Sequence, residues 1–332
     1  MSPRRRGVTQ VRAVNMGPGR LCRRSRPGPS SQTPTQGGIF CSAFARSVFR
    51  DARLTFSSVR LIAFLFACFC VCAVAGSSGA ETPVAFLAVG DFGTGGVQER
   101  AIGRRMKLYD AKKPADLLVL LGDNDYTRSP ASFRANWRAS FGWARRSGLP
   151  VAGVLGNHDY QVGRGRYELG LLGMPGRYYK RTLGEAELFL LDSNSVSDRQ
   201  TRWLEEQLQS STALWKIAFF HHPPYTCGGH AGDLRVAHRW VRLFEKYGVQ
   251  LVVSGHDHNY QRFVARNGVT YIVHGGGAAG LYALRSCPPS YPTRVLSSLE
   301  HGFLSVVLSD ETLYGSAVDL RGHVTDRFAL TP

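Results

Sequence analysis

The sequence predicts a mixed α/β domain over residues 81–332, with helices lying outside β-sheets. Its first apolar runs, such as "PVAFLAVGD" and "DLLVLLGD", are short and continuous, which is typical of strands covered on both faces. Segments with apolar residues at helical spacing separate these runs, and the C-terminal part holds only strand-like runs and turns. Strands that alternate with helices and then give way to a β-rich end indicate a mixed α/β fold.

The first half of the domain is expected to hold three strands and two helices. "PVAFLAVGD" is the first strand, and Val97 to Lys112 form a helix with Ile102, Met106 and Tyr109 on one face. "DLLVLLGD" is the second strand, residues 131–146 form the second helix, and "PVAGVLGN" is the third strand.

The second half is expected to hold two further helices and seven strands. The strands "AELFLLDSN" and "WKIAFFHH" flank a helix that Asp198 is expected to cap. Asp233 is expected to cap the next helix, whose apolar residues are Ala237, Trp240, Val241 and Phe244. "VQLVV" is the sixth strand, and the last four are expected in "VTYIVHGGG", "HGFLSVVLSD", "TLYGSAVDL" and "VTDRFALT".

The net charge of +17 is concentrated at the N-terminus. Residues 1–60 hold 12 Arg, no Lys and one acidic residue, Asp51, which leaves +6 for residues 61–332. Because this segment has too few apolar residues for a core, it is predicted to be a disordered basic leader or to result from a mis-assigned start. A basic arm that contacts nucleic acid is the alternative, but no nucleic-acid partner is expected.

Residues 61–80 resemble a secretory signal peptide. Arg60 precedes fifteen apolar residues, and Ala73-Val74-Ala75 fits a small-x-small cleavage site. The mature protein is therefore expected to be secreted or periplasmic, with only transient membrane contact. A retained anchor is the alternative, although a spanning helix needs about 20 apolar residues. A lipid on Cys68 is disfavoured by Phe66.

Only two of the seven cysteines, Cys227 and Cys287, follow the predicted cleavage site. In an oxidising compartment two such cysteines can pair, and the disulfide would tie two loops together. The alternative is a pair of free buried thiols.

Polar clusters follow five of the predicted strands, at the edge where ligands bind in α/β sheets. Glycines in these clusters allow sharp turns. Two histidines one residue apart in "GHDHN" can point to the same side of an extended loop. Together the clusters offer more carboxylate, phenol, amide and imidazole groups than one tetrahedral zinc ion binds. The number suits two cations that are bridged by a carboxylate. The clusters are Gly90-Asp91-Phe92-Gly93, Gly122-Asp123-Asn124-Asp125-Tyr126, Gly156-Asn157-His158-Asp159, His221-His222-Pro223 and Gly255-His256-Asp257-His258.

The motif order GDxG, GDxxY, GNH, HxP and GHxH resembles the purple acid phosphatases among the calcineurin-like metallophosphoesterases. The resemblance spans residues 84–265 directly and favours the small, single-domain, tartrate-resistant acid phosphatase-like type. It implies a four-layer fold of two packed mixed β-sheets flanked by helices. The first motif lacks the histidine of the DxH form that most of the superfamily carries, and Tyr126 stands where the purple enzymes have a tyrosinate ligand.

The resemblance implies a binuclear metal centre in which Asp123 bridges the two ions. An Fe(III) site is expected to be formed by Asp91, Asp123, Tyr126 and His258. A second site for Fe(II), Zn(II) or Mn(II) is expected to be formed by Asp123, Asn157, His221 and His256. His221 is preferred over His222 because the family's ligand lies two residues before the proline.

Other residues are expected to act on the substrate or to support the ligands. His158 is the expected proton donor, and Asn157, His158, His222 and His230 are expected to bind substrate. Asp159 and Asp257 are expected to orient neighbouring imidazoles. His238, His301 and His323 are read as structural or surface residues.

The implied activity is hydrolysis of small-molecule phosphate monoesters at acidic pH, by attack of a metal-bound hydroxide, in a monomeric protein. One alternative is a phosphodiesterase, which the missing DxH histidine disfavours. The other is a non-catalytic protein that binds metal or phosphate on this scaffold, which the complete ligand set disfavours.

Overall fold

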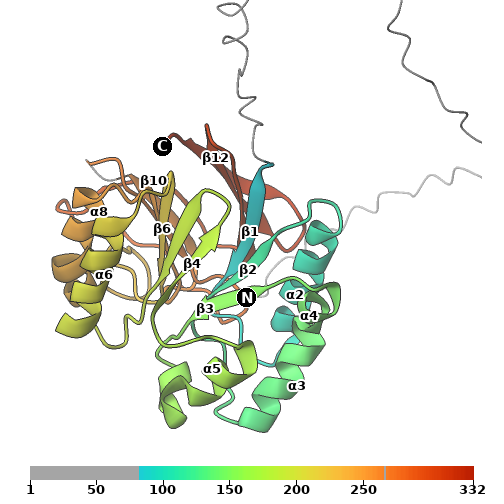
Figure 1. Cartoon of the computed structure of the whole chain (residues 1–332). Helices are drawn as coiled ribbons and strands as arrows, with labels where there is room; N and C mark the ends of the chain where they lie inside the picture. Colours follow the sequence, from blue (N-terminus) through green and yellow to red (C-terminus); the bar gives the residue numbers. More distant parts are fainter. Residues whose placement is uncertain (1–81, 265–266) are drawn as a thin grey trace, which may run out of the picture. The chain divides into compact units, whose positions relative to one another are not determined.

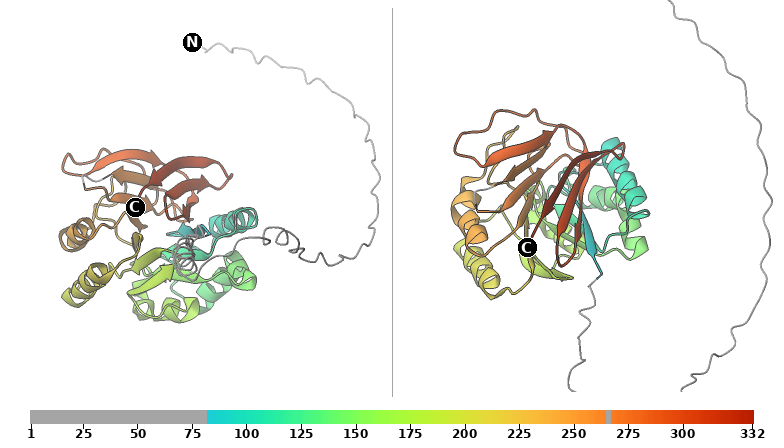
Figure 2. Two further views of the ribbon diagram at one scale, coloured as in Figure 1. Left: turned by 45° about the horizontal axis from the view of Figure 1, so that its top comes forward. Right: turned by 90° about the horizontal axis from the view of Figure 1, so that it is seen from above.

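Two β-sheets pack face to face, and helices cover their outer faces (Figure 1). The structure is a computed structural model that describes residues 82–264 and 267–332. The predicted leader (1–60) and signal peptide region (61–80) lie outside the described residues. Figure 2 shows the sheets and helices from two other directions. The two mixed sheets lie between two helical layers, which confirms the predicted four-layer α/β fold.

The first sheet has the strand order β13-β12-β11-β1-β2-β3. Its first three strands in the chain are parallel, whereas β11 pairs antiparallel with β1 and begins the C-terminal antiparallel part. The parallel strands all end at the same edge of the sheet. The strands are β1 (Val84–Val89), β2 (Leu117–Leu121), β3 (Val151–Val154), β11 (Gly302–Leu308), β12 (Leu313–Asp319) and β13 (Val324–Leu330).

The second sheet has the strand order β10-β8-β9-β7-β6-β5-β4. Its four central strands β9, β7, β6 and β5 are parallel, and antiparallel strands flank them on both sides. The strands are β4 (Tyr179–Leu183), β5 (Ala186–Leu190), β6 (Trp215–Phe220), β7 (Leu251–Ser254), β8 (Tyr260–Val264), β9 (Thr270–His274) and β10 (Thr293–Ser298).

The helices are divided between the two outer faces. Ile102 and Met106 from the first group pack with strands of the first sheet, and Leu204 and Phe244 from the second group pack with strands of the second. The first group is α2 (Val97–Asp110), α3 (Pro130–Ser140), α4 (Gly142–Ser147) and α5 (Arg166–Leu172), after the short 3-10 turns η1 (Asp159–Gln161) and η2 (Gly163–Gly165). The second is α6 (Asp198–Ser210), α7 (Leu234–Val236), η3 (Ala237–Val241) and α8 (Arg242–Lys246).

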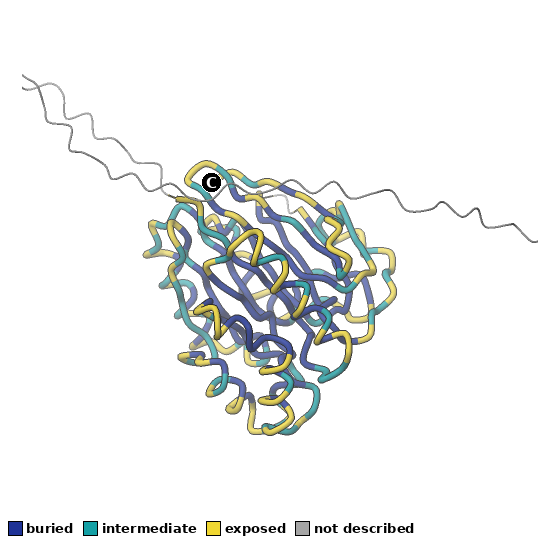
Figure 3. Tube along the Cα trace, turned by 90° about the vertical axis from the view of Figure 1, so that its right-hand side faces the viewer, coloured by how far each residue is buried: buried dark blue, intermediate teal, exposed yellow. Residues whose placement is uncertain are grey.

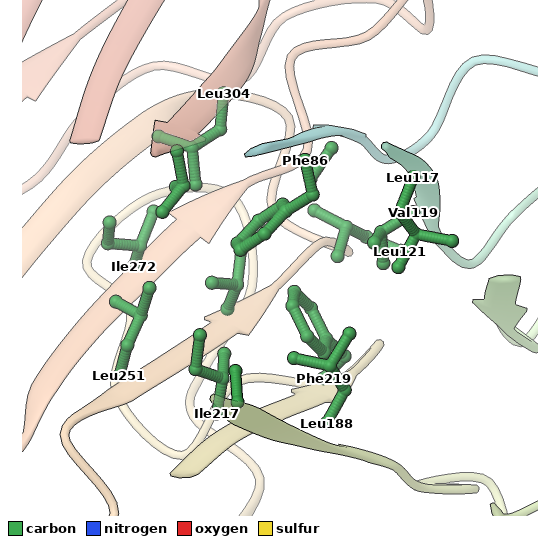
Figure 4. Packing of buried hydrophobic residues seen from close by; sticks show 14 of the residues in the cluster. Phe86, Leu117, Val119, Leu121, Leu188, Ile217, Phe219, Leu251, Ile272 and Leu304 are labelled. Carbon is green, nitrogen blue, oxygen red and sulfur yellow. The ribbon is translucent and has the colours of Figure 1, made fainter. Parts of the chain in front are cut away.

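The central core lies between the two sheets. Phe86 and Leu304 of the first sheet meet Phe219 and Ile272 of the second in a fully buried cluster (Figure 4). Figure 3 shows the buried strands at the centre and the exposed helical turns around them. No helix in residues 82–264 or 267–332 is both long and apolar enough to cross a membrane.

Several predicted elements have different bounds or were missed. The expected helix over residues 131–146 breaks at Phe141, whose φ of −119° and ψ of 0° are not helical. Asp198 is the first residue of α6 rather than its cap, because the Ser197 hydroxyl accepts a hydrogen bond from the Gln200 amide. Asp233 caps its helix as predicted. The missed strands β4, β8 and β10 are rich in polar residues, and the missed α5 is only two turns long.

Candidate metal centre

The turns that follow the parallel strands hold three site residues in a left-handed backbone conformation. The φ angles are 56° for Asp91, 50° for Asp123 and 71° for His256. Such strain in residues other than glycine concentrates at functional sites. Two glycines leave room for the carboxylates: a Cβ on Gly255 would lie 2.5 Å from Asp91 Oδ2, and one on Gly156 would lie 2.1 Å from Asp123 Oδ1.

Three of the predicted Fe(III) ligands come together around Asp91. Tyr126 Oη lies 3.3 Å from Asp91 Oδ1 and 3.2 Å from His258 Nε2. His258 Nε2 lies 3.4 Å from the same Asp91 oxygen. One carboxylate, one phenol and one imidazole therefore point their donor atoms at a common point.

The second predicted set comes together around His221. Its Nε2 lies 3.4 Å from Asp123 Oδ1, 3.2 Å from Asn157 Oδ1 and 3.3 Å from His256 Nδ1. The same nitrogen is 4.0 Å from Asp91 Oδ1, so the two sets are contiguous. Donor atoms of Asp91, Asp123 and His221 all lie within 4.8 Å of one another, a spacing that could hold a metal ion.

Backbone carbonyl oxygens fix the orientation of two imidazoles. His221 Nδ1 lies 2.9 Å from the Leu121 carbonyl oxygen, and His258 Nδ1 lies 2.7 Å from that of Gly280. In the neutral ring each Nδ1–H donates to its carbonyl, and the lone pair on Nε2 faces the carboxylates. This arrangement is the usual one for a histidine that binds a metal.

The centre combines buried carboxylates with imidazole and phenol groups. Asp91 and Asp123 are at most 2% exposed, and burial raises the pKa of the Asp91 carboxyl above its usual value. Burial opposes the charged form of His221, but Asp123 and Asp91 raise its pKa to about 9. Burial and the same two carboxylates raise the pKa of the Tyr126 phenol. Positive charge therefore stabilises these carboxylates, and the donor set fits a pair of cations.

Three further histidines border this centre, namely His158, His222 and His230. His158 Nε2 lies 3.9 Å from Asp123 Oδ2, and its ring lies 4.2 Å from that of Tyr126. The exposed His230 stacks on His256 with ring centres 4.1 Å apart. All predicted site residues are thus in one region, while His238 and His323 lie exposed and His301 binds the Gly276 carbonyl.

His222 forms a hydrogen bond that the sequence did not indicate. Its Nδ1 lies 2.9 Å from the hydroxyl of Ser193, which follows β5. Burial, and then the neighbouring His221, lower the His222 pKa to about 3, so this ring is neutral. One ring nitrogen of His222 also lies within 4.8 Å of a ring nitrogen of His221 and of His256. These three histidines are therefore close enough to bind one metal ion together.

The expected roles of Asp159 and Asp257 were wrong. Asp159 accepts hydrogen bonds from the backbone amides of Asn124, Asp125 and Gly156 and from the Asn124 side chain, so it joins two strand-end turns. Asp257 accepts from Thr226, from the Gly229 amide and from Gln261. Neither carboxylate hydrogen-bonds an imidazole within the described residues, because backbone amides occupy most of Asp159 and the Thr226 and Gln261 side chains and one amide occupy Asp257.

Sequence reasoning missed one aromatic neighbour of the centre. Tyr282 stacks on His258 with ring centres 4.1 Å apart and planes 10° apart. It lies in an irregular loop after β9, where no residue pattern marks it.

Comparison with known proteins gives the same family. Residues 80–260 match the family model of the calcineurin-like phosphoesterases. The chain is 24% identical to Purple acid phosphatase 7 of Arabidopsis thaliana over 289 residues, which cover 75% of this chain and 86% of the relative. It is 26% identical to Tartrate-resistant acid phosphatase type 5 of Mus musculus, over 60% of this chain and 74% of the relative.

Solved structures share the fold at lower identity. The purple acid phosphatase PPD1 from yellow lupin superposes with a TM-score of 0.64 at 17% identity, over 76% of this chain and 54% of that structure. GAP50, the anchor in the inner membrane complex of Plasmodium, also gives 0.64, at 19% identity, over 76% of this chain and 89% of that structure. By its family match and its strand-end site, this chain belongs to the calcineurin-like phosphoesterases, with purple acid phosphatases among its homologues.

Proposed function

We propose that this phosphoesterase is an acid phosphatase that hydrolyses phosphate monoesters at a binuclear metal centre. The observation that carries the proposal is the position of Tyr126, whose hydroxyl lies within hydrogen-bond distance of both Asp91 and His258. A tyrosine in the ligand set, with no histidine at residue 93, is the feature that the sequence shares with the purple enzymes.

The metals proposed are Fe(III) with Asp91, Asp123, Tyr126 and His258, and Fe(II), Zn(II) or Mn(II) with Asp123, Asn157, His221 and His256. Phenolate and carboxylate oxygens are hard donors that suit a trivalent ion, whereas imidazole also suits divalent iron and zinc. When bound, such a pair of ions supplies Lewis-acid chemistry and activates water for attack on phosphorus.

The chain's own residues would bind and orient the ester. Asn157 offers a neutral amide oxygen, which leaves positive charge at the centre for a phosphate dianion. His158, which is 31% exposed beside Asp123, is proposed to donate a proton to the leaving alcohol. His222 and His230 flank His256 and are proposed to line the phosphate-binding rim.

The proposed setting is secreted or periplasmic, with a small-molecule phosphate ester as substrate and a monomeric chain. A disulfide between Cys227 and Cys287 supports an oxidising compartment. Nucleic acid is not proposed as a partner, because +11 of the net charge of +17 lies in residues 1–60, outside the domain.

Activity has to be tested directly, because a fold does not determine it. GAP50, which shares this fold, is described as an anchor. The full chain with its metals should hydrolyse p-nitrophenyl phosphate faster than bis-p-nitrophenyl phosphate at acidic pH. A preference for the bis ester would favour a phosphodiesterase, and loss of both activities with metals bound would favour a binding protein.

The same preparation tests the tyrosine ligand. The protein should contain about two metal ions and show a broad visible absorption band, which Tyr126→Phe should abolish while at least one ion remains bound. Tyr109→Phe, at a tyrosine that packs against Phe303 away from the centre, is the matched control. A colourless protein with two divalent ions would contradict the tyrosinate–Fe(III) assignment and leave the fold assignment intact.

A further inference from the structure

A large cavity lies outside the candidate metal centre, among helices α3, α4 and α5. Its volume is about 830 Å³, and its lining includes no residue of the metal centre. The lining residues are Pro130, Phe133, Arg134, Trp137 and Arg138 from α3, Gly142, Arg145 and Arg146 from α4, and Arg166, Tyr167, Gly170 and Leu171 from α5. We call this the arginine cavity.

The arginine cavity is lined by five arginines and by no acidic residue or lysine. None of the five takes part in an ion pair within the described part of the chain. The local chain is also one-sided, since residues 126–158 contain five Arg and no Asp or Glu. Residues 82–332 as a whole hold 29 basic and 22 acidic residues, a net charge of +7.

Helical spacing directs these side chains to one place. Phe133 and Trp137 are at most 8% exposed and form an apolar floor, and Arg134 and Arg138 follow each of them by one residue. Gly142 continues this face: a Cβ there would lie 3.0 Å from Arg146 Nη1, so the missing side chain makes room for that guanidinium.

The opposite wall is formed by α5. It contributes Arg166 and the aromatic ring of Tyr167, which is 46% exposed. The arginine cavity therefore combines guanidinium groups with an apolar and aromatic surface.

From this arrangement we propose that the arginine cavity binds a small organic polyphosphate, with two or more phosphate groups on a planar or apolar carrier. Arginine forks bind phosphate oxygens in pairs, which lysine cannot do. A converging set of cations in a concave site concentrates anions. The aromatic residues provide a surface for the carrier.

Charge excludes two other occupants of the cavity. The N-terminal segment of this chain, residues 1–60, has a net charge of +11, and a second copy of the domain is also positive. Both would be repelled by the five arginines. A hollow of this volume also fits a compact ligand better than a flat anionic membrane.

The test is calorimetric titration of the full chain, with its metals, with the imido analogue of ATP and with tripolyphosphate. The variant Arg138→Gln/Arg146→Gln should bind one equivalent of the imido analogue fewer than wild type, or bind that equivalent at least about 30-fold more weakly. Arg134→Gln/Arg166→Gln, which removes one arginine from α3 and one from α5, should have the same effect. Weaker binding of tripolyphosphate would show that the carrier contributes.

The matched control is Arg104→Gln/Arg199→Gln, which removes the same charge from exposed positions of α2 and α6. An equal loss of binding in this control would show general attraction by net charge and overturn the proposal. Unchanged stoichiometry and affinity in both cavity variants would also overturn it, as would binding of anionic vesicles but not of the small polyphosphates. If the metal centre binds no phosphate compound, wild type should bind one equivalent and the cavity variants none, so the two proposals fail separately.

Discussion

Individual residues at the strand ends are held in positions that an unconstrained chain would avoid. Asp91, Asp123 and His256 have positive φ. Backbone hydrogen bonds in the same turns fix this conformation. The His256 amide itself donates to Asp91 Oδ2. The strain is therefore maintained by contacts between turns, and it places donor atoms before any ligand arrives.

At this scale we predict the behaviour of His158. If it donates a proton to the leaving alcohol, His158→Ala should lower kcat on an alkyl phosphate by about 100-fold or more. The loss on p-nitrophenyl phosphate should be smaller, because nitrophenolate leaves without a proton. Steady-state kinetics on both substrates measures the difference.

The control for this prediction is His238→Ala, at an exposed position of η3. An equal loss on both substrates would indicate that His158 positions the phosphate group and does not transfer the proton.

At the scale of elements, the loops after β6 and β9 complete the centre and are covalently joined. Cys227 lies in the loop that carries His222 and His230, and Cys287 lies in the loop that carries Tyr282. The disulfide closes a segment of 60 residues. It therefore holds two irregular loops against each other where no sheet pairing does so.

We expect Cys227→Ser/Cys287→Ser to lower the free energy of unfolding by about 4 kcal/mol, from the chain entropy of a closed loop of this length. Guanidinium unfolding of the folded domain measures the change. A reductant should destabilise wild type and leave the double variant unchanged. Equal stability of the two proteins in oxidising buffer would contradict the expectation.

At the scale of the whole molecule, the metal centre and one polar cluster both connect the two sheets. Asp91, Asp123 and Asn157 follow strands of the first sheet, whereas the proposed histidine ligands follow strands of the second. On another side of the core, Asp326 of β13 accepts hydrogen bonds from Tyr260 and Arg262 of β8. Any ion held by the centre would therefore cross-link the sheets.

Removal of the metals should consequently lower the thermal midpoint, by about 5–10 °C for each ion that is present at 100 times its dissociation constant. Differential scanning calorimetry with and without a chelator measures the shift, and added metal should reverse it. Asp123→Asn, which lacks the carboxylate proposed to bridge the ions, should show a much smaller shift. A chelator effect of the same size in that variant would place the stabilising metal elsewhere.

The strand-end site could be predicted from the sequence because its signals are local. A buried strand reads as a short apolar run, and the glycine and donor that follow it are adjacent in the chain, as in Gly122-Asp123 and Gly255-His256. The carboxyl ends of parallel strands meet at one edge, so these donors could be expected to converge. The disulfide was also expected, since only Cys227 and Cys287 follow the predicted signal peptide.

Features that depend on pairing between distant segments could not be predicted from the sequence and are visible only in the folded chain. The edge strands β4 and β10 are largely polar, and β8 carries Gln261 and Arg262 next to each other; all three become strands because neighbouring strands offer hydrogen-bond partners. Asp159 could not be read as a brace for two turns, because its donors lie on the preceding strand-end loop. The arginine cavity likewise exists only because α5 packs near α3 and α4, which no local pattern encodes.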